Sequence, residues 1–159
     1  WSAFPAPTII LKNAAAVGYK KPIYNSFAAA SKDLIVQGGA NAEGTYVSSM
    51  RLLAPETLSA DDPMRQIVQK IYADYKERYK EAPATFTAHS YDALLIIEAA
   101  SKKIQGPITR QSLRDAMETV SVAGGNGLYR LSPKSHGPDP ESRSMILLVV
   151  KNGEWKVDE

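Results

Sequence analysis

The sequence predicts an α/β fold, a parallel sheet with flanking helices followed by a C-terminal antiparallel hairpin. Two observations lead to this prediction. Helical and strand-like patterns alternate over residues 1–50, with connections too short for anything but crossovers between parallel strands. Near the end of the chain, Asn152 and Gly153 form a two-residue turn signal between apolar segments, which is typical of an antiparallel hairpin.

The N-terminal elements follow from hydrophobic spacing and glycine positions. Apolar residues recur at helical spacing from Ala6 to Val17, and Gly18 stands where a C-terminal cap belongs. The next helix ends at the glycine pair 38–39. We expect, in order, a helix over 6–17, a buried strand over 20–26, a helix over 29–37 and a strand over 44–50.

Three helices in a row are predicted in the middle of the chain. The first has Pro63 in its first turn and a continuous apolar stripe that ends at Tyr79. Thr109 is a good N-cap for the third. We expect helices that begin at Asp61 or Asp62, extend over 86–103 and extend over 109–120. A strand at GLYRLS (127–132) and a surface loop over 132–142 precede the hairpin.

Composition excludes several classes of function. The 19 Lys and Arg residues balance 17 Asp and Glu residues without a basic block, so neither nucleic acid nor a membrane surface is an expected partner. The longest apolar run, MILLVV at 145–150, is far too short to span a bilayer. Cysteine is absent, which excludes disulfides and thiolate chemistry. The chain starts with neither Met nor a leader pattern, and we expect it to be part of a longer protein.

Few residues suggest catalysis or metal binding. The two histidines, His89 and His136, have no companion ligands at metal-binding spacing, so no metal or cofactor is expected. His136 is predicted to be solvated, and His89 to be hydrogen-bonded and partly buried, a role favoured over that of a catalytic base. No serine lies in a nucleophile motif, and the glycines at 38–39 and 124–127 are predicted to be turns, because they match no phosphate-binding pattern.

Two segments remain as candidates for ligand binding, SAFPAPT (2–8) and NSFAAAS (25–31). Each leads into the predicted N-terminus of a helix, where free amides and the helix dipole favour ligand oxygens. The alternative is that Thr8 and Ser26 only cap helices and that Phe4 and Phe27 are only core residues. The sequence pattern leaves both interpretations open.

Segments along the whole chain resemble one known family. The stretches GYKKP, AEGTYV, YDALL and GPDP, the last before the final hairpin, together resemble the C-terminal half of the branched-chain amino acid type of periplasmic solute-binding protein. These type I periplasmic binding proteins are extracellular ligand-binding receptors of binding-cassette (ABC) importers. They have two α/β lobes joined by three crossovers, and the ligand is held between the lobes.

The resemblance implies a division of the chain. It predicts second-lobe segments at both ends and first-lobe helices between them. In order, these are a second-lobe segment (1–47), a hinge crossover (48–59), first-lobe helices (60–124), a return crossover (125–132) and a second-lobe hairpin (133–159).

The resemblance also implies ligand-binding residues. In amino-acid-binding relatives, the loop after the strand equivalent to PIYNS bears a carboxylate that pairs with the ligand's ammonium group. Here Phe27 stands near that place beside Ser26, and the first acid is Asp33. A buried, unpaired cation is costly, so an aromatic or aliphatic acid or a neutral polar compound is favoured over a zwitterionic amino acid. Phe4, Ser90 and Tyr91 lie where relatives contact the ligand.

The expected function is a non-enzymatic solute-binding receptor in the periplasm, with a membrane permease as its partner and a small organic acid or amino-acid-like compound as its ligand. A sensor of the same fold, a small α/β hydrolase that uses His89 with a serine, and a purely structural interaction domain remain alternatives. Because half of the family fold is missing, we expect the stripe Ile67, Val68, Ile71, Tyr72 and Tyr75 and the face Leu94–Ile97 to be uncovered. A homodimer or element exchange would hide them.

Overall fold

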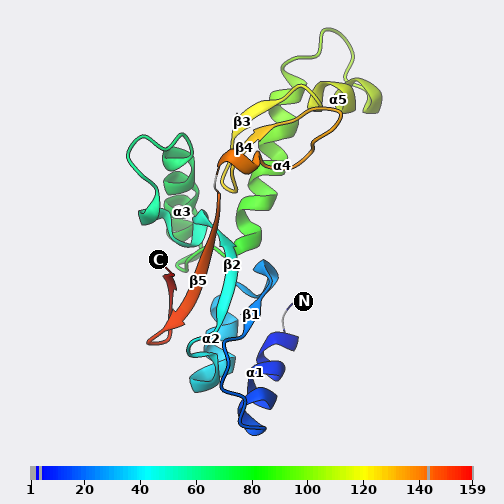
Figure 1. Cartoon of the computed structure of the whole chain (residues 1–159). Helices are drawn as coiled ribbons and strands as arrows, with labels where there is room; N and C mark the ends of the chain where they lie inside the picture. Colours follow the sequence, from blue (N-terminus) through cyan, green and yellow to red (C-terminus); the bar gives the residue numbers. More distant parts are fainter. Residues whose placement is uncertain (1–2, 4, 143, 159) are drawn as a thin grey trace.

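The computed structural model describes residues 3, 5–142 and 144–158. Figure 1 shows an elongated molecule, with a sheet and two helices in its lower part and α4 rising from the sheet toward α5. The main elements are α1 (Ala6–Ala16), β1 (Tyr24–Asn25), α2 (Lys32–Gly38), β2 (Tyr46–Met50), α3 (Arg65–Tyr79), α4 (Thr85–Ser101), α5 (Arg110–Met117), β3 (Ser121–Ala123), β4 (Leu128–Arg130), β5 (Met145–Lys151) and β6 (Glu154–Val157).

The four-stranded sheet has the order β1-β2-β5-β6. Strands β1 and β2 are parallel, with Tyr24 opposite Tyr46. Strand β5 is antiparallel to β2, and β6 is antiparallel to β5. The predicted α/β class is confirmed, and the C-terminal hairpin extends the same sheet as the parallel pair.

The chain turns abruptly after β1. The predicted strand over 20–26 forms ladder pairs only at Tyr24–Asn25, because a short 3-10 helix, Phe27–Ala29, follows at once. The amide of Ala29 donates to the carbonyl of Ser26 at 2.9 Å. The helix predicted over 29–37 starts later, at Lys32, because the Ser31 hydroxyl accepts from the Leu34 amide and caps it there.

Side-chain hydrogen bonds lie at or near the starts of two later helices. The carboxylate of Asp62 accepts from the amide of Met64 at 2.8 Å, immediately before α3. At α5, the Thr109 hydroxyl accepts from the amide of Ser112, whose hydroxyl accepts in turn from the Thr109 amide. The predicted cap at Thr109 is confirmed as a reciprocal capping box. The predicted cap at Asp62 was wrong, because α3 begins at Arg65, after Pro63, with Met64 as its N-cap and no side-chain cap.

Helix α5 is shorter than the predicted range 109–120. It ends at Met117, and residues Ser121–Ala123 form β3, which pairs with β4 in a second, two-stranded sheet. Val120 is buried at 1% exposure and packs in a cluster with Ala100 of α4. Val120 therefore packs on α4 instead of continuing helix α5. The strand predicted at 127–132 is present as β4 and pairs with β3.

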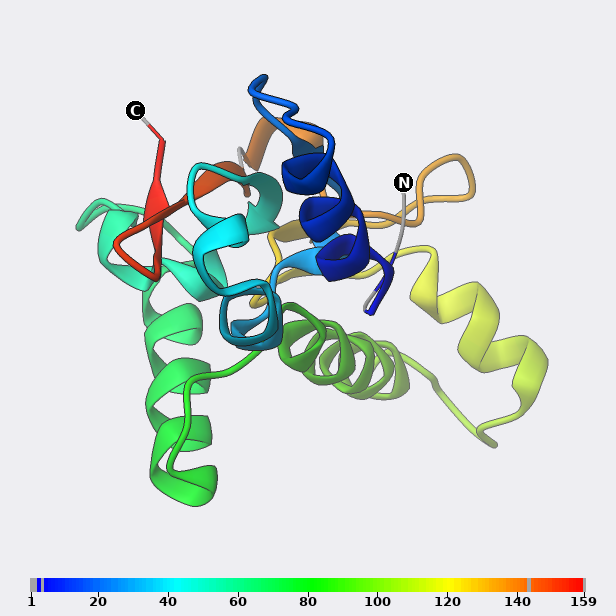
Figure 2. The same ribbon diagram turned by 90° about the horizontal axis from the view of Figure 1, so that it is seen from below.

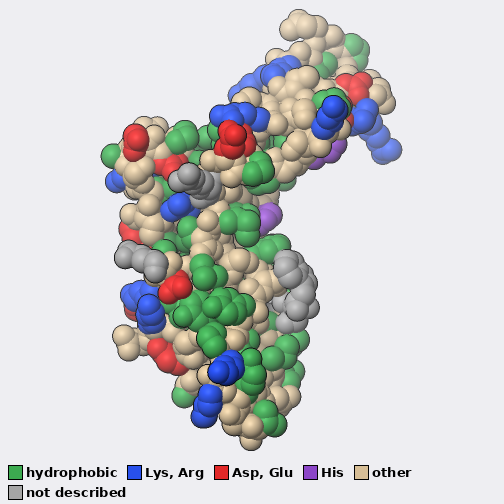
Figure 3. All heavy atoms as spheres, in the orientation of Figure 1, with side chains coloured by type: hydrophobic (Ala, Val, Ile, Leu, Met, Phe, Trp, Pro, Cys, Tyr) green, Lys and Arg blue, Asp and Glu red, His purple; other side chains and the backbone are tan. Residues whose placement is uncertain are grey.

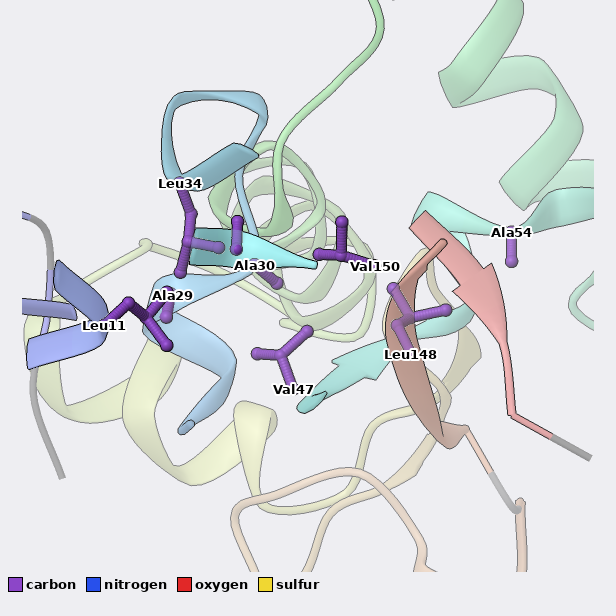
Figure 4. Close-up of a cluster of buried hydrophobic side chains, with 9 residues drawn as sticks. Leu11, Ala29, Ala30, Leu34, Val47, Ala54, Leu148 and Val150 are labelled. Atoms are coloured by element: carbon purple, nitrogen blue, oxygen red, sulfur yellow. The ribbon is translucent and has the colours of Figure 1, made fainter. Parts of the chain in front are cut away.

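One hydrophobic core lies between the sheet and the first two helices. Figure 4 shows its side chains converging from α1, α2, β2 and β5. Its buried members are Leu11, Ala29, Ala30, Leu34, Ala42, Val47, Ala54, Leu148 and Val150. Segments from both ends of the chain thus share a single core.

Two further cores flank α4. One is formed by Leu52, Leu58, Met64, Val68, Ile71 and Ala88, and the other by Ile96, Ala100, Val120, Tyr129 and Leu131. Figure 2 views α4 nearly end-on, with α3 on one side and α5 on the other. Helix α4 therefore contributes to both clusters.

The expectation that the α3 stripe is uncovered was wrong for its central residues. Val68 is 0% exposed and Ile71 is 5% exposed, because Leu52 and Leu58 of the preceding segment pack on them. On α4, by contrast, Leu94 is 70% exposed and Ile97 is 39% exposed. Dimerisation through such a face stays a prediction.

Apolar side chains also gather on the lower part of the molecule in Figure 3, where the four-stranded sheet lies. Tyr24 of β1 is 65% exposed and Met145 of β5 is 58% exposed. In the described residues, the structure contains no helix that is both long and apolar enough to cross a membrane.

The predicted hairpin turn is confirmed, and a side chain from elsewhere in the chain, which the sequence analysis did not identify, is hydrogen-bonded to it. Asn152 and Gly153 adopt φ angles of 57° and 71°, which match a turn that requires left-handed residues. The carboxylate of Glu43, preceding β2, accepts from the amide of Asn152 at 2.7 Å and from that of Gly153 at 3.2 Å. Glu43 therefore holds the β5–β6 turn against the start of β2.

Glu43→Gln should lower the free energy of unfolding by about 1 kcal/mol, because the amide side chain has only one acceptor for two backbone donors and lacks the charge. Chemical denaturation of the natural chain and the variant measures the difference. The exposed Glu56→Gln is a matched control with an expected change below about 0.5 kcal/mol. Equal losses in the two variants would contradict this role of Glu43.

Candidate ligand-binding site

The end of β1 is the first part of the candidate site. Ser26 follows the strand in an extended conformation and is 5% exposed. Phe27 begins the 3-10 helix and is half-buried. The predicted strand-to-helix junction is therefore present, with Phe27 more accessible than Ser26.

Three aromatic rings meet at this junction. The ring of Phe27 lies 6.0 Å from that of Phe86, edge to face, and 5.9 Å from the imidazole of His89, with an interplanar angle of 18°. Phe86 and His89 are 5.8 Å apart. These three residues, here called the ring cluster, join the end of β1 to the first turns of α4.

Hydrogen bonds fix the same junction. The hydroxyl of Thr85, the first residue of α4, donates to the carbonyl of Ala30 at 3.0 Å, and both residues are buried. The Nδ1 atom of His89 lies 3.1 Å from the carbonyl oxygen of Thr85. Because a carbonyl oxygen only accepts, Nδ1 is the donor. The predicted hydrogen-bonded, partly buried state of His89 is confirmed.

The structure places some of the predicted site residues at the ring cluster and others on the exposed surface of α4. Phe27 is in the ring cluster and Ser26 is beside it. Ser90 and Tyr91, the next residues of α4 after His89, are exposed, Tyr91 at 39%. Phe4 lies outside the described residues. The ligand-binding role of all five residues stays a prediction.

Sequence reasoning missed Phe86 as a site residue. Its ring is 54% exposed although it contacts both Phe27 and His89. The available signal was its spacing, because Phe86 and His89 are three positions apart and share a helix face. The contact with Phe27, 59 positions away in sequence, left no local signal.

A buried carboxylate lies one turn further along α4. Asp92 is 2% exposed and accepts from the amide of Gly125 at 2.6 Å, the amide of Asn126 at 2.9 Å and the hydroxyl of Tyr129 at 2.9 Å. Burial raises the pKa of Asp92 above its usual range, and the three hydrogen bonds hold back that rise. Asp92 therefore binds the β3–β4 turn to α4.

This turn fits closely against the helices. A Cβ atom on Gly124 would lie 2.6 Å from Oδ1 of Asp92. One on Gly125 would lie 2.8 Å from Ile71 and 2.9 Å from Ala88. Glycine is needed at these positions because only a bare backbone can approach the two helices so closely. The predicted turn at 124–127 is confirmed, and its tertiary role explains the glycines.

The residues of the ring cluster line none of the five main hollows of the described surface, of which the largest, about 620 Å³, lies beside Met50 and Pro138. One of about 310 Å³ is lined by α1 and the segments before β1 and β2, including Lys20 and Glu43. Another, of about 280 Å³, lies between α2 and α3 and includes Tyr72 and Trp155. In the part of the chain that the structure describes, no group of three acidic, histidine or cysteine side chains could hold a metal ion.

The chain belongs to the periplasmic binding protein family, because the family profile matches residues 1–154. An extracellular ligand-binding receptor from Rhodopseudomonas palustris is 30% identical with a TM-score of 0.87, over 99% of this chain and 46% of that one. A putative branched-chain amino acid ABC transporter from Rhodospirillum rubrum is 31% identical with a TM-score of 0.66, over 99% and 42%.

A leucine-binding protein from Thermotoga maritima, 22% identical with a TM-score of 0.78 over 99% of this chain and 42% of that one, shares the fold. The chain thus spans less than half the length of these structures. A search of curated proteins gives no match. The resemblance to type I periplasmic binding proteins is confirmed, and the matched relatives are described as ligand-binding receptors and transporter components.

Asp92→Asn should lower the free energy of unfolding at neutral pH by about 1–3 kcal/mol, because its amide nitrogen cannot accept from the turn. Since burial raises the pKa of Asp92, the folded chain keeps a proton on this carboxyl at a pH where the unfolded chain has lost it. Acidification through the raised pKa therefore stabilises the natural chain and not the variant. Denaturation at a series of pH values measures the difference, which should grow as the pH falls.

The exposed Asp33→Asn is the control for this experiment and should change stability by less than about 0.5 kcal/mol. A difference between the natural chain and Asp92→Asn that shrinks on acidification would contradict the stated effect of burial on Asp92.

Proposed function

We propose that the chain is part of a solute-binding receptor of an ABC importer, which works in the periplasm and delivers a small organic ligand to a membrane permease. Family membership supports the receptor role, as do the titles of the matched structures, which name an extracellular ligand-binding receptor and an ABC transporter. The same findings favour a receptor over the hydrolase alternative.

The position of the ring cluster supports a ligand site between the two lobes. Phe27 follows β1, in the segment assigned to the second lobe, whereas Phe86 and His89 begin α4, assigned to the first lobe. A ligand that touches both sides binds more tightly when the lobes are closed. Closure then follows from this difference in affinity between the open and closed states.

The charges near the cluster support the ligand class. An α-amino acid needs a carboxylate for its ammonium group, since a desolvated cation without a partner costs several kcal/mol. Asp33, the first acid after β1, is exposed on α2, and Asp92 already accepts three hydrogen bonds. We therefore propose an aromatic or aliphatic acid as the ligand, with the ring cluster as its apolar wall. This cluster is the observation on which the ligand class rests.

In the full-length receptor, Phe27→Glu should weaken binding of the native acid by at least about tenfold, because it places a desolvated negative charge beside an anionic or apolar ligand. Phe27→Leu, which stays apolar, should retain more of the affinity. A thermal-shift screen of aromatic acids, aliphatic acids, amides and amino acids finds the ligand, because a bound ligand raises the melting temperature. Calorimetric titration then gives each affinity.

Thermal denaturation of the unliganded variants is the control for folding. Micromolar binding of leucine by the unmodified receptor, without a response to aromatic or aliphatic acids, would show that Phe27 is an ordinary core residue.

A further inference from the structure

We propose that His89 determines ligand specificity by accepting a hydrogen bond at Nε2 from a hydroxyl or N–H group on the ring of an aromatic ligand. This inference rests on the proposed function, because it assumes that the ring cluster lines the ligand site. It goes beyond that function by naming the polar atom that selects among aromatic compounds.

The tautomer of His89 follows from its contact with Thr85. The carbonyl oxygen of Thr85 accepts the proton of Nδ1, 3.1 Å away and one helical turn earlier. A neutral imidazole has one N–H group and one bare nitrogen. With the proton on Nδ1, the Nε2 atom presents a lone pair and needs a donor. It attracts hydroxyl and N–H groups and disfavours a carboxylate or an ether oxygen.

The direction of Nε2 follows from the hydrogen bond that Nδ1 makes. Phe27 lies nearly parallel to the imidazole, at 18°, and Phe86 lies beside it on the same helix, while the hydrogen bond from Nδ1 to Thr85 orients the ring. Nδ1 points back along α4 to Thr85, and Nε2 lies across the ring from it. Within the described residues, Nε2 has no hydrogen-bond partner.

The neighbouring polar groups do not satisfy this atom. Asp92, three positions further along α4, lies within electrostatic reach of His89, but a carboxylate offers no proton and its oxygens accept from the turn. A half-buried acceptor without a partner favours a ligand that supplies a donor. The exposed part of Phe86 offers that ligand an aromatic surface beside Nε2.

The matched pair of probes is a hydroxybenzoate and the corresponding fluorobenzoate, at each of the three ring positions. The two are similar in size, and only the hydroxyl donates. In the full-length receptor at mildly alkaline pH, where imidazole side chains are neutral, the best hydroxybenzoate should bind about tenfold or more tightly than its fluoro counterpart. Calorimetric titration measures this ratio of affinities.

Two variants separate the ring of His89 from its acceptor. His89→Phe keeps an aromatic ring against Phe27 and Phe86 but has no acceptor, so the ratio should fall to within about threefold. His89→Gln loses the ring but its amide oxygen reaches a similar place, so the ratio should stay nearer that of the natural receptor. Melting temperatures of the unliganded variants report whether each is folded.

A natural receptor that binds both probes equally, or a ratio that His89→Phe leaves unchanged, would overturn the role of His89 and leave the proposed function standing. A receptor that binds only aliphatic acids would overturn the inference and leave the proposed ligand class standing. A receptor that binds neither aromatic nor aliphatic acids would overturn both. A preference for hydroxybenzoate that is lost in His89→Phe and retained in His89→Gln supports the proposal.

Discussion

The middle of the structure depends on the hydrogen bonds that the buried carboxylate of Asp92 accepts. This carboxylate accepts from two backbone amides of the β3–β4 turn and from Tyr129 while almost completely buried. A desolvated carboxylate is costly unless its oxygens are hydrogen-bonded, and the turn supplies the donors. Its glycines let the backbone come close enough to do so. The core beside α3 and the core beside α5 are thereby joined through α4.

Helix α4 connects this junction to the candidate site. Thr85, Phe86 and His89 occupy its first turns, and Asp92 follows within one turn of His89. The first turns contact the segment after β1, through the Thr85 hydroxyl and the ring cluster. Helix α4 therefore joins the segment after β1 to the β3–β4 turn through contacts at its first turns and at Asp92.

Local patterns were enough to predict the class of fold and most of its elements. The cap at Thr109 and the turn at Asn152 are encoded by a few neighbouring residues, and both are confirmed. The 3-10 helix after β1 was not predicted, because Ser26 and Ser31 are both plausible caps and only packing decides between them. Phe27 could be selected as a site residue from sequence, but its contacts with α4 could not. The role of Asp92 has no local signal at all, since its partners are 33 to 37 positions away.

Amide hydrogen exchange at Gly125 and Asn126 tests the central role of Asp92 most directly. Both amides donate to a buried carboxylate, so they should exchange only when the chain unfolds globally, with protection equal to that of the β2 and β5 amides. The amide of Gly106, in the exposed turn after α4, should exchange rapidly. Exchange of Gly125 and Asn126 at a rate close to that of Gly106 would show that the turn opens freely and would contradict the account.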